Sequence, residues 1–324
     1  MKKALGFCLL LSLSAGILSA QKPVSAEDYY KRGLAKIKTA ESATSVSLAE
    51  KNYKLAVEDF SQAIEIEPEN PEFYLQRGRC SYKTFDVEQA IWDFNSAIKL
   101  DPDLAEAYVE RGKIFADSQL EDEEREETIK RAFADFEKAI KLNPKNADFY
   151  LVRGQLLFSE LTEDETDIEN NKLALADLSK AISNAPNLAE ALVFRAQIHF
   201  YFKENENSIA DSTKAITLKP RNAEALKIRG RTYAALEKYD LAVADFTAAI
   251  KLEPKDPDLY FYRAVVYGKM GKKLEAKADK MQEEKLLKIN ANKLNEYRKQ
   301  IIYGLSKETI EKTSLISEDT DLPD

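Results

Sequence analysis

Six prolines recur at a nearly constant pitch along the 324-residue chain. Successive prolines are 34, 42, 42, 34 and 34 residues apart, and they are Pro68, Pro102, Pro144, Pro186, Pro220 and Pro254. Each ends a similar phrase, such as AVEDFSQAIEIEP, AIWDFNSAIKLDP or AVADFTAAIKLEP. A fixed period of this length indicates an array of copied supersecondary units, none of which buries its apolar face alone. Such an array offers a long surface for binding and no closed pocket built for chemistry.

One unit is predicted to contain two helices. Between residues 223 and 252, small and apolar residues recur at threes and fours, the spacing of one helical face: Leu226, Gly230, Tyr233, Ala242, Phe246 and Ala249. Pro254 ends the second helix, because its ring clashes with the preceding turn and it has no amide proton to donate. The small residues mark a close approach of two helices, and Phe246 fills the gap between them.

These positions resemble the tetratricopeptide repeat family, whose unit is a 34-residue helical pair. The resemblance covers residues 26–288, with repeats at about 26–68, 69–102, 103–144, 145–186, 187–220, 221–254 and 255–288. The family's small residue in the first helix is met by Gly33, Gly78, Gly112, Gly154, Ala196, Gly230 and Ala264. The resemblance implies an all-α, right-handed superhelical solenoid of about seven helical hairpins. Repeat five departs from the pattern with Ser208 and Ser212, and repeat seven with Lys280, so we expect these two repeats to be the least stable.

An arginine precedes the small residue in all seven units, and an aspartate recurs in every second helix. The arginines are Arg32, Arg77, Arg111, Arg153, Arg195, Arg229 and Arg263, and the aspartates are Asp59, Asp93, Asp135, Asp177, Asp211, Asp245 and Asp279. A guanidinium fork matches a carboxylate at two points, so we expect a structural ladder of ion pairs. Anion binding is the functional alternative.

The N-terminus has the pattern of a secretory signal peptide. Lys2 and Lys3 precede an apolar run of about fifteen residues, which is short for a membrane span of about 20. We predict a signal peptide over residues 1–20, cleaved after Ala20 or Ala26, with an uncleaved anchor as the alternative. The mature chain is then expected to be exported, periplasmic or secreted, without an integral membrane span. Only Cys80 remains as a thiol, which excludes an internal disulfide, and we expect it to be a small core residue.

Charge argues against nucleic acid as a partner. The net charge is −8, and loss of the two N-terminal lysines makes it −10, whereas phosphate backbones require clustered lysine and arginine. The acidity is concentrated between the helices of repeats three and four, in segments 121–127 and 160–169, with net charges of −5 and −6. We expect these segments to form an acidic ridge that contains Glu121, Asp122, Glu123, Glu124, Glu163, Asp164, Glu165 and Asp167. A solvated edge, a basic partner and weakly held divalent cations all remain open, and no calcium-loop motif is present.

The resemblance also implies that the first helix of each repeat lines a concave groove. The residues at these positions are mostly apolar: Tyr30, Leu34, Leu75, Tyr82, Val109, Leu151, Phe158, Val193, Phe200, Tyr201 and Phe261. We expect a peptide or helix of a protein partner to lie there, with Phe158, Phe200 and Tyr201 as the leading cluster. The alternative is that part of this set seals neighbouring repeats. Recognition of a terminal carboxylate by lysine and asparagine is not expected, since apolar residues fill those addresses.

Signals for an enzyme, a metal site or a cofactor are absent from the sequence. His199 is the one histidine, and we expect it to be a core residue; no phosphate loop or nucleophile motif accompanies it. Trp92 is expected to be partly exposed. Beyond the array, residues 289–306 are predicted to form a capping helix with the apolar stripe Leu294, Tyr297, Ile301 and Leu305, followed by an acidic disordered tail at 307–324.

The sequence therefore predicts a non-enzymatic adaptor of the bacterial cell envelope. A periplasmic holdase or assembly factor for exported or outer-membrane proteins is the alternative, distinguished by many unfolded clients in place of one complex. An enzyme is the third hypothesis and would need a site that the sequence does not display.

Overall fold

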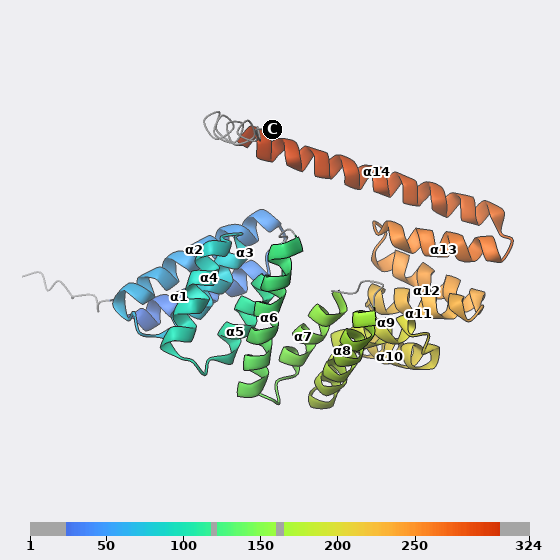
Figure 1. Cartoon of the computed structure of the whole chain (residues 1–324). Coiled ribbons are helices and arrows are strands. Elements are labelled where there is room, and N and C mark those ends of the chain that lie inside the picture. The colour runs from blue at the N-terminus through green and yellow to red at the C-terminus, as the bar shows by residue number, and fades with distance from the viewer. Residues whose placement is uncertain (1–23, 118–121, 160–164, 305–324) are drawn as a thin grey trace, which may run out of the picture. The chain divides into compact units, whose positions relative to one another are not determined.

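The computed structural model describes residues 24–117, 122–159 and 165–304, and places side chains there except at 122–124, 159, 165–169 and 290–304. This part of the chain is all helical and contains fourteen α-helices in paired hairpins (Figure 1). The chain divides into two compact units, residues 1–128 and 129–324. The prediction of an all-α array of helical hairpins is confirmed.

Unit 1 holds five complete helices and the beginning of a sixth. They are α1 (Ala26–Glu41), α2 (Val46–Ile66), α3 (Pro71–Lys83), α4 (Val87–Leu100), α5 (Ala105–Asp117) and the first turns of α6 (Asp122–Leu142).

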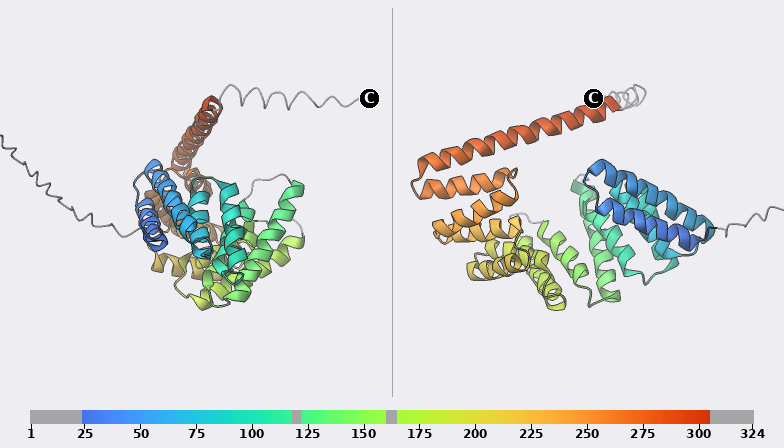
Figure 2. Two further views of the ribbon diagram at one scale, coloured as in Figure 1. Left: turned by 90° about the vertical axis from the view of Figure 1, so that its left-hand side faces the viewer. Right: turned by 180° about the vertical axis from the view of Figure 1, so that it is seen from behind.

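Unit 2 holds the remainder of α6 and eight further helices. They are α7 (Ala147–Ser159), α8 (Glu165–Asn184), α9 (Ala189–Tyr201), α10 (Asn205–Leu218), α11 (Ala223–Ala235), α12 (Tyr239–Leu252), α13 (Pro257–Lys269) and α14 (Lys273–Gly304). The hairpins α9–α10, α11–α12 and α13–α14 follow one another in the right-hand view of Figure 2. Below, the first helix of a repeat is called helix A and the second helix B.

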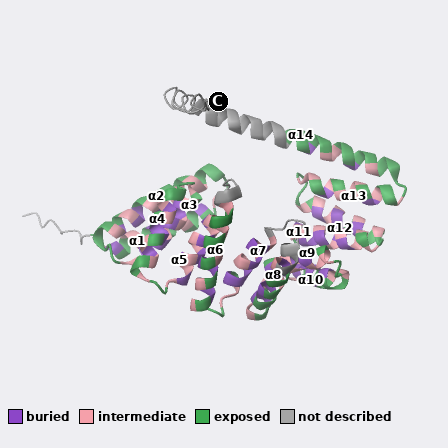
Figure 3. Cartoon of the chain, in the orientation of Figure 1, coloured by how far each residue is buried: buried purple, intermediate pink, exposed green. Residues whose placement is uncertain are grey.

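In four hairpins a glycine of helix A faces a large residue of helix B: Gly33 and Phe60, Gly78 and Phe94, Gly154 and Leu178, and Gly230 and Phe246. A Cβ atom added at Gly78 would lie 2.8 Å from the ring of Phe94, and one at Gly230 would lie 2.8 Å from Phe246. Buried residues accordingly occupy the facing sides of paired helices, and exposed residues the outer sides (Figure 3). The alternation of small and large residues in the sequence therefore corresponds to the contact between the two helices of a hairpin.

The periodic prolines end helix B, and their carbonyl groups also accept a hydrogen bond from the next helix A. The hydroxyl group of the helix A tyrosine donates to the carbonyl of the proline six residues before it, at 3.0 to 3.2 Å in four repeats: Tyr74 to Pro68, Tyr108 to Pro102, Tyr150 to Pro144 and Tyr260 to Pro254. This bond fixes the linker between one repeat and the next, and repeats five and six lack it because Leu192 and Leu226 stand at the tyrosine position.

Repeat five replaces the apolar contact of helix B with buried hydroxyl groups. Ser208 and Ser212 are both fully buried. The Oγ of Ser208 lies 2.9 Å from Oγ1 of Thr232 on α11, and Ser212 donates to the carbonyl of Ser208. The helix A residue at the corresponding position is Ala196, and repeat seven likewise has Ala264, where the other repeats have glycine.

The inserted residues of repeats three and four lengthen helix B. Helices α6 and α8 have 21 and 20 residues, whereas α4, α10 and α12 have 14 each. The prediction that the acidic segments are loops is therefore wrong for residues 122–127 and 165–169, which are helical. Acidic residues suit this place, because the first turn of a helix carries a partial positive charge.

The expected separate capping helix is also not observed. Helix α14 runs without a break from Lys273 to Gly304, so helix B of repeat seven continues through the expected boundary at residue 289. The side chains of the predicted stripe Leu294, Tyr297 and Ile301 lie outside the described residues, as do Leu305, the tail and the predicted signal peptide. Among the helices described, none is long and apolar enough to cross a membrane.

Candidate protein-binding surface

The recurring arginines and aspartates meet within their own repeats. The side chains are 2.7 to 3.0 Å apart in six pairs: Arg32–Asp59, Arg77–Asp93, Arg153–Asp177, Arg195–Asp211, Arg229–Asp245 and Arg263–Asp279. All six aspartates are buried. The hydrogen bond to the aspartate raises the pKa of Arg153, Arg229 and Arg263. Arg111 belongs to unit 1 and Asp135 to unit 2, so their pairing stays a prediction.

Most of these arginines also hold the preceding repeat. The Nη1 atom donates to a polar side chain on helix B of the preceding repeat. The bonds are Arg77–Ser61, Arg111–Asn95, Arg195–Ser179, Arg229–Thr213 and Arg263–Thr247. Each acceptor lies two residues after the aspartate of its own repeat. This link is not among the predictions, although the sequence shows a small polar residue at a fixed offset from each of these aspartates. These arginines bond both the aspartate of their own repeat and a polar side chain of the preceding repeat. This arrangement favours a structural role as an ion-pair ladder over anion binding.

The predicted groove residues divide by burial. Four are buried, and for these the alternative of packing between repeats holds: Leu75, Val109, Leu151 and Val193. They are therefore not available on the surface of the free protein. Four are half-buried, namely Tyr30, Tyr82, Phe158 and Phe200, and three are exposed, namely Leu34, Tyr201 and Phe261.

In unit 2 the helix A face of the last three repeats is organised around Arg231 on α11. Its guanidinium carbon lies 4.6 Å from the ring centre of Phe200 on α9 and 4.9 Å from that of Tyr262 on α13. Beside this stack, Tyr201, Phe261 and Val265 are 50%, 45% and 48% exposed. We call these six residues the aromatic face. It joins three successive repeats through one cation held between two rings.

The leading cluster of the sequence analysis is only partly brought together. Phe158 makes its ring contact with Phe194, at 6.4 Å between centres, and Tyr201 makes its contact with Phe202, at 5.7 Å. Phe200 instead stacks on Arg231. Arg231 is visible in the sequence as a helix A arginine, but the repeat pattern alone does not indicate that it contacts aromatic rings of the two adjacent repeats.

In unit 1 the helix A face is more polar than expected. Tyr30 donates to Glu72 at 3.2 Å, Arg79 to Glu110 at 3.2 Å, and Tyr82 to Asp117. Burial, together with the neighbouring carboxylates, raises the pKa of Tyr30 and of Tyr82 to about 12. These bonds each join successive A helices. Polar bonds between successive A helices therefore accompany the predicted groove positions of this unit, and the groove itself stays a prediction.

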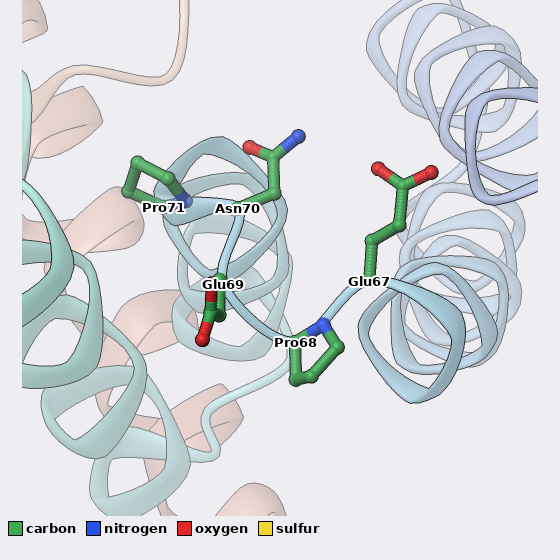
Figure 4. A pocket seen from close by; sticks show the side chains of 5 residues that line it. All are labelled: Glu67, Pro68, Glu69, Asn70 and Pro71. Atoms are coloured by element: carbon green, nitrogen blue, oxygen red, sulfur yellow. The ribbon is translucent and has the colours of Figure 1, made fainter.

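A surface hollow of about 540 Å³ lies at the linker between α2 and α3 (Figure 4). Its lining is Glu67, Pro68, Glu69, Asn70 and Pro71. The Asn70 side chain accepts from the amide of Glu72 and so caps α3. The two carboxylates point in different directions in Figure 4. This hollow results from the tight turn of the linker. Its lining side chains do not form a catalytic arrangement.

The acidic ridge is described only in part. Glu121, Glu163 and Asp164 lie outside the described residues. The backbones of Asp122, Glu123 and Glu124 are in α6, and those of Glu165 and Asp167 are in α8. The two segments fall in different units, so their meeting in one ridge stays a prediction.

Three further residues were singled out by the sequence. His199 is half-buried and not a full core residue; its Nδ1 lies 2.6 Å from Glu204. Cys80 is 1% exposed, and burial raises the pKa of its thiol to about 12, so it is a poor nucleophile. Trp92 is 55% exposed and packs on Tyr74, with ring centres 5.9 Å apart. In the described part of the chain, no group of three or more histidine, cysteine or acidic side chains could hold a metal ion.

Comparison with protein families gives two matches. Residues 230–271 match a TPR repeat model, and residues 45–70 match a tetratricopeptide repeat model. No curated protein matches the sequence.

Three solved structures share the fold at low identity. A tetratricopeptide repeat protein from Parabacteroides merdae covers 87% of this chain and 97% of its own, with 17% identity and a TM-score of 0.53. PilF of Pseudomonas aeruginosa covers 67% and 91%, with 15% identity and a TM-score of 0.56. PilW, described as a widely conserved type IV pilus biogenesis factor, covers 76% and 98%, with 16% identity and a TM-score of 0.53.

The matched segments lie near both ends of the described array. Hairpins between them share the arginine–aspartate pairs, as in Arg77–Asp93, Arg153–Asp177 and Arg195–Asp211. The chain therefore contains tetratricopeptide repeat segments at residues 45–70 and 230–271, within a fold like that of solved tetratricopeptide repeat structures.

Proposed function

We propose that this protein is a non-enzymatic adaptor that binds a peptide or helix of another protein on the helix A face of unit 2. The observation that carries the proposal is the aromatic face, where Tyr201, Phe261 and Val265 are each about half exposed beside the stack of Phe200, Arg231 and Tyr262. Aromatic and arginine side chains are those enriched at the centres of protein interfaces.

The geometry supports a docking surface because the aromatic face is held in place before any partner arrives. Arg231 connects α9, α11 and α13 through its two ring contacts. In the last three repeats, ion pairs also secure helix A to its own helix B: Arg195–Asp211, Arg229–Asp245 and Arg263–Asp279. A surface that is rigid beforehand loses less conformational entropy on binding.

We also propose that the protein acts outside the cytoplasm, in the bacterial envelope or as a secreted protein. The support is the N-terminal sequence, in which Lys2 and Lys3 precede an apolar run of signal-peptide length.

Photo-crosslinking in the native cell tests the binding proposal. A photoreactive residue is placed at Phe200 or Phe261 on the aromatic face, and at Glu58 as an exposed control on helix B of repeat one. We expect one dominant captured protein from the aromatic face and none from Glu58. Many exported clients from the aromatic face would favour the holdase alternative, and no capture specific to this face would contradict the proposal.

A further inference from the structure

The turn between α13 and α14, in repeat seven, gathers exposed lysines around an exposed leucine. Residues 269–281 carry a net charge of +3, whereas the whole chain carries −8. Leu274 is 82% exposed, and Met281, about two helical turns later on the same face of α14, is 62% exposed. The turn projects at the edge of unit 2 (Figure 1). The name basic tip is used below for Lys269, Lys272, Lys273, Leu274, Lys277 and Met281.

The positive charges of the basic tip are not neutralised by the fold. Its four lysines are exposed, and within the part of the chain that the structure describes none of them forms an ion pair. Lys272 has a contact of another kind, since its Nζ lies 5.9 Å from the ring centre of Tyr267. The buried carboxylate of Asp279 is already bound by Arg263. The lysines are therefore free to contact an anionic surface outside the protein.

The start of α14 differs from the start of helix B in other repeats. The second residue of helix B is acidic in repeats two, five and six, where it is Glu88, Glu206 and Asp240. Such residues stabilise the first turn of a helix, because this end carries a partial positive charge. Repeat seven has an acidic residue only at the third position, Glu275, and begins with Lys273 and Leu274. A lysine and an exposed leucine at these positions add nothing to the stability of the hairpin.

A polar end of the array accounts for only part of the basic tip. The last repeat has no neighbour to cover its outer helix, and polar residues there keep an array soluble. This requirement explains Lys277, because the equivalent residue of repeat six, Val243, packs against a core cluster. It does not explain Leu274 and Met281, since exposed apolar residues lower solubility. Lysines and exposed apolar residues together are typical of helices that lie on a membrane surface.

We propose that the basic tip docks the protein on a membrane surface that contains anionic phospholipid. Leu274 and Met281 enter the headgroup region, and the lysines reach the lipid phosphates with their methylene stems beside the apolar residues. A protruding leucine needs no complementary cavity in a fluid bilayer, whereas a specific protein interface buries about 1,200 Å² or more with matched shape. This docking goes beyond the proposed function and does not rest on it.

Sedimentation with lipid vesicles tests the proposal. The chain from Gln21 onward is used, because it retains every described residue and lacks the N-terminal apolar run, which itself has affinity for lipid. The vesicles contain phosphatidylcholine alone or phosphatidylcholine mixed with phosphatidylglycerol. We expect the protein to sediment only with the mixed vesicles and to be released at about 1 M salt, where the Debye length is about 3 Å. Equal binding to both kinds of vesicle, or to neither, would overturn the proposal.

Reversal of two charges provides the matched comparison. Lys273→Glu combined with Lys277→Glu alters the basic tip, and Lys251→Glu combined with Lys255→Glu makes the same change in net charge at two exposed lysines around Pro254. We expect the first pair to weaken binding to the mixed vesicles at least about tenfold and the second to leave it unchanged. Equal weakening by both pairs would assign the effect to net charge and overturn the proposal.

Leu274→Ser separates insertion from attraction by charge alone. We expect this variant to bind the mixed vesicles at least about threefold more weakly than the wild type, because it loses apolar surface to the bilayer. Unchanged binding would contradict insertion of the tip. Circular dichroism checks the fold of each variant, and Lys269→Glu combined with Lys272→Glu replaces the first charge pair if that pair does not fold.

An acidic protein is the competing occupant of the basic tip. In that case Lys273→Glu combined with Lys277→Glu loses a co-purifying protein in native cells, while the wild type does not sediment with the mixed vesicles. This pair of results would overturn docking on a membrane. The proposed function is tested separately, by capture from Phe200 and Phe261, and its failure would leave the vesicle results unchanged.

Discussion

At the scale of single residues, the repeated arginine of helix A connects its own repeat with the preceding one. Arg77 donates to both carboxylate oxygens of Asp93 through Nε and Nη2 and to Ser61 of the preceding helix B through Nη1. Its side chain is 13% exposed, and that of Asp93 is fully buried. A buried carboxylate without its cation remains desolvated, and no ion pair then offsets this cost in free energy.

We therefore expect Arg77→Ala to lower the free energy of unfolding by about 3 to 5 kcal/mol. Lys54→Ala is the control, because its pair with Glu50 is exposed, at 61% and 42%, and such pairs contribute about 0 to 1 kcal/mol. Chemical denaturation of both variants measures the difference. Equal midpoints for the two variants would remove the ladder as a source of stability.

The glycines of helix A differ in how closely other residues pack against them, and two alanine substitutions test this difference. A methyl group at Gly78 would lie 2.8 Å from Phe94 and 3.1 Å from Cβ of Asp93, whereas nothing lies within 4 Å of one at Gly268. We expect Gly78→Ala to cost about 1 to 3 kcal/mol by overpacking, and Gly268→Ala to stabilise α13 by about 0.5 to 1 kcal/mol. Thermal unfolding measures both changes, and a shift of the same sign in both would contradict this account.

Residue patterns predicted contacts inside a repeat better than contacts between repeats. Gly230 and Phe246 could be paired from spacing alone, because the family pattern places them in one hairpin. The bond from Arg229 to Thr213 could not be deduced in the same way, since it depends on how far one hairpin is rotated on the next. The contact of Arg231 with Phe200 and Tyr262 has the same origin.

At the scale of elements, hairpin α9–α10 departs most from its neighbours. Ser208, Ser212 and Thr232 form buried hydrogen bonds where other repeats pack apolar groups. At the turn between the two helices, Glu204 accepts from Asn207 at 3.1 Å and lies 2.6 Å from Nδ1 of His199. These two hydrogen bonds, that of Asn207 first, lower the pKa of Glu204 below its ordinary value of 4.5.

The stability of this hairpin should therefore depend on pH in the acid range. A carboxylate whose pKa is lowered by folding stabilises the fold above its unfolded pKa, and this contribution is lost as the pH falls through the folded value. We expect Glu204→Gln to unfold earlier than the wild type at about pH 6 and to approach it at about pH 3. Denaturation midpoints across this range test the expectation, and a constant difference would contradict it.

Element boundaries were predicted poorly where insertions occur. The sequence places the segments at 121–127 and 160–169 in loops because they are acidic insertions between the two helices of their repeats. The structure instead extends α6 and α8 through much of them. A helix that continues from a packed helix B needs no apolar face of its own for its first turns, so periodicity does not identify it. The same reasoning explains why α14 passes the expected boundary at residue 289.

At the scale of the whole molecule, the start of α1 bears on the predicted cleavage of the signal peptide. Ser25 and Asp28 form a reciprocal capping box at the start of α1, and Ala26 is fully buried against Ala63 and Phe73. Cleavage after Ala26 would remove both the cap and the buried residue, at a cost of about 1 kcal/mol for the cap alone. Between the two sites left open by the sequence, we expect cleavage after Ala20. Mass spectrometry of the exported protein should find a chain that begins at Gln21, and a chain that begins at Glu27 would contradict this.

Equivalent positions of the A helices differ in exposure between repeats. Composition and repeat pattern indicate a scaffold, but they do not separate buried positions from exposed ones. Leu75 and Phe261 occupy equivalent positions in their repeats, yet Leu75 is 2% exposed and Phe261 is 45% exposed. The difference arises from what packs beside each helix, and a single repeat does not contain that information.

The most direct test of the central claim is a comparison of two charge substitutions at equally exposed apolar residues. Phe261→Glu alters the aromatic face, and Leu241→Glu alters helix α12, where the leucine is 50% exposed. Each tagged variant is purified from native cells, and the co-purifying proteins are quantified against the wild type by mass spectrometry. We predict that Phe261→Glu loses the main partner and that Leu241→Glu keeps it. Equal recovery of the partner by both variants would contradict binding on the helix A face.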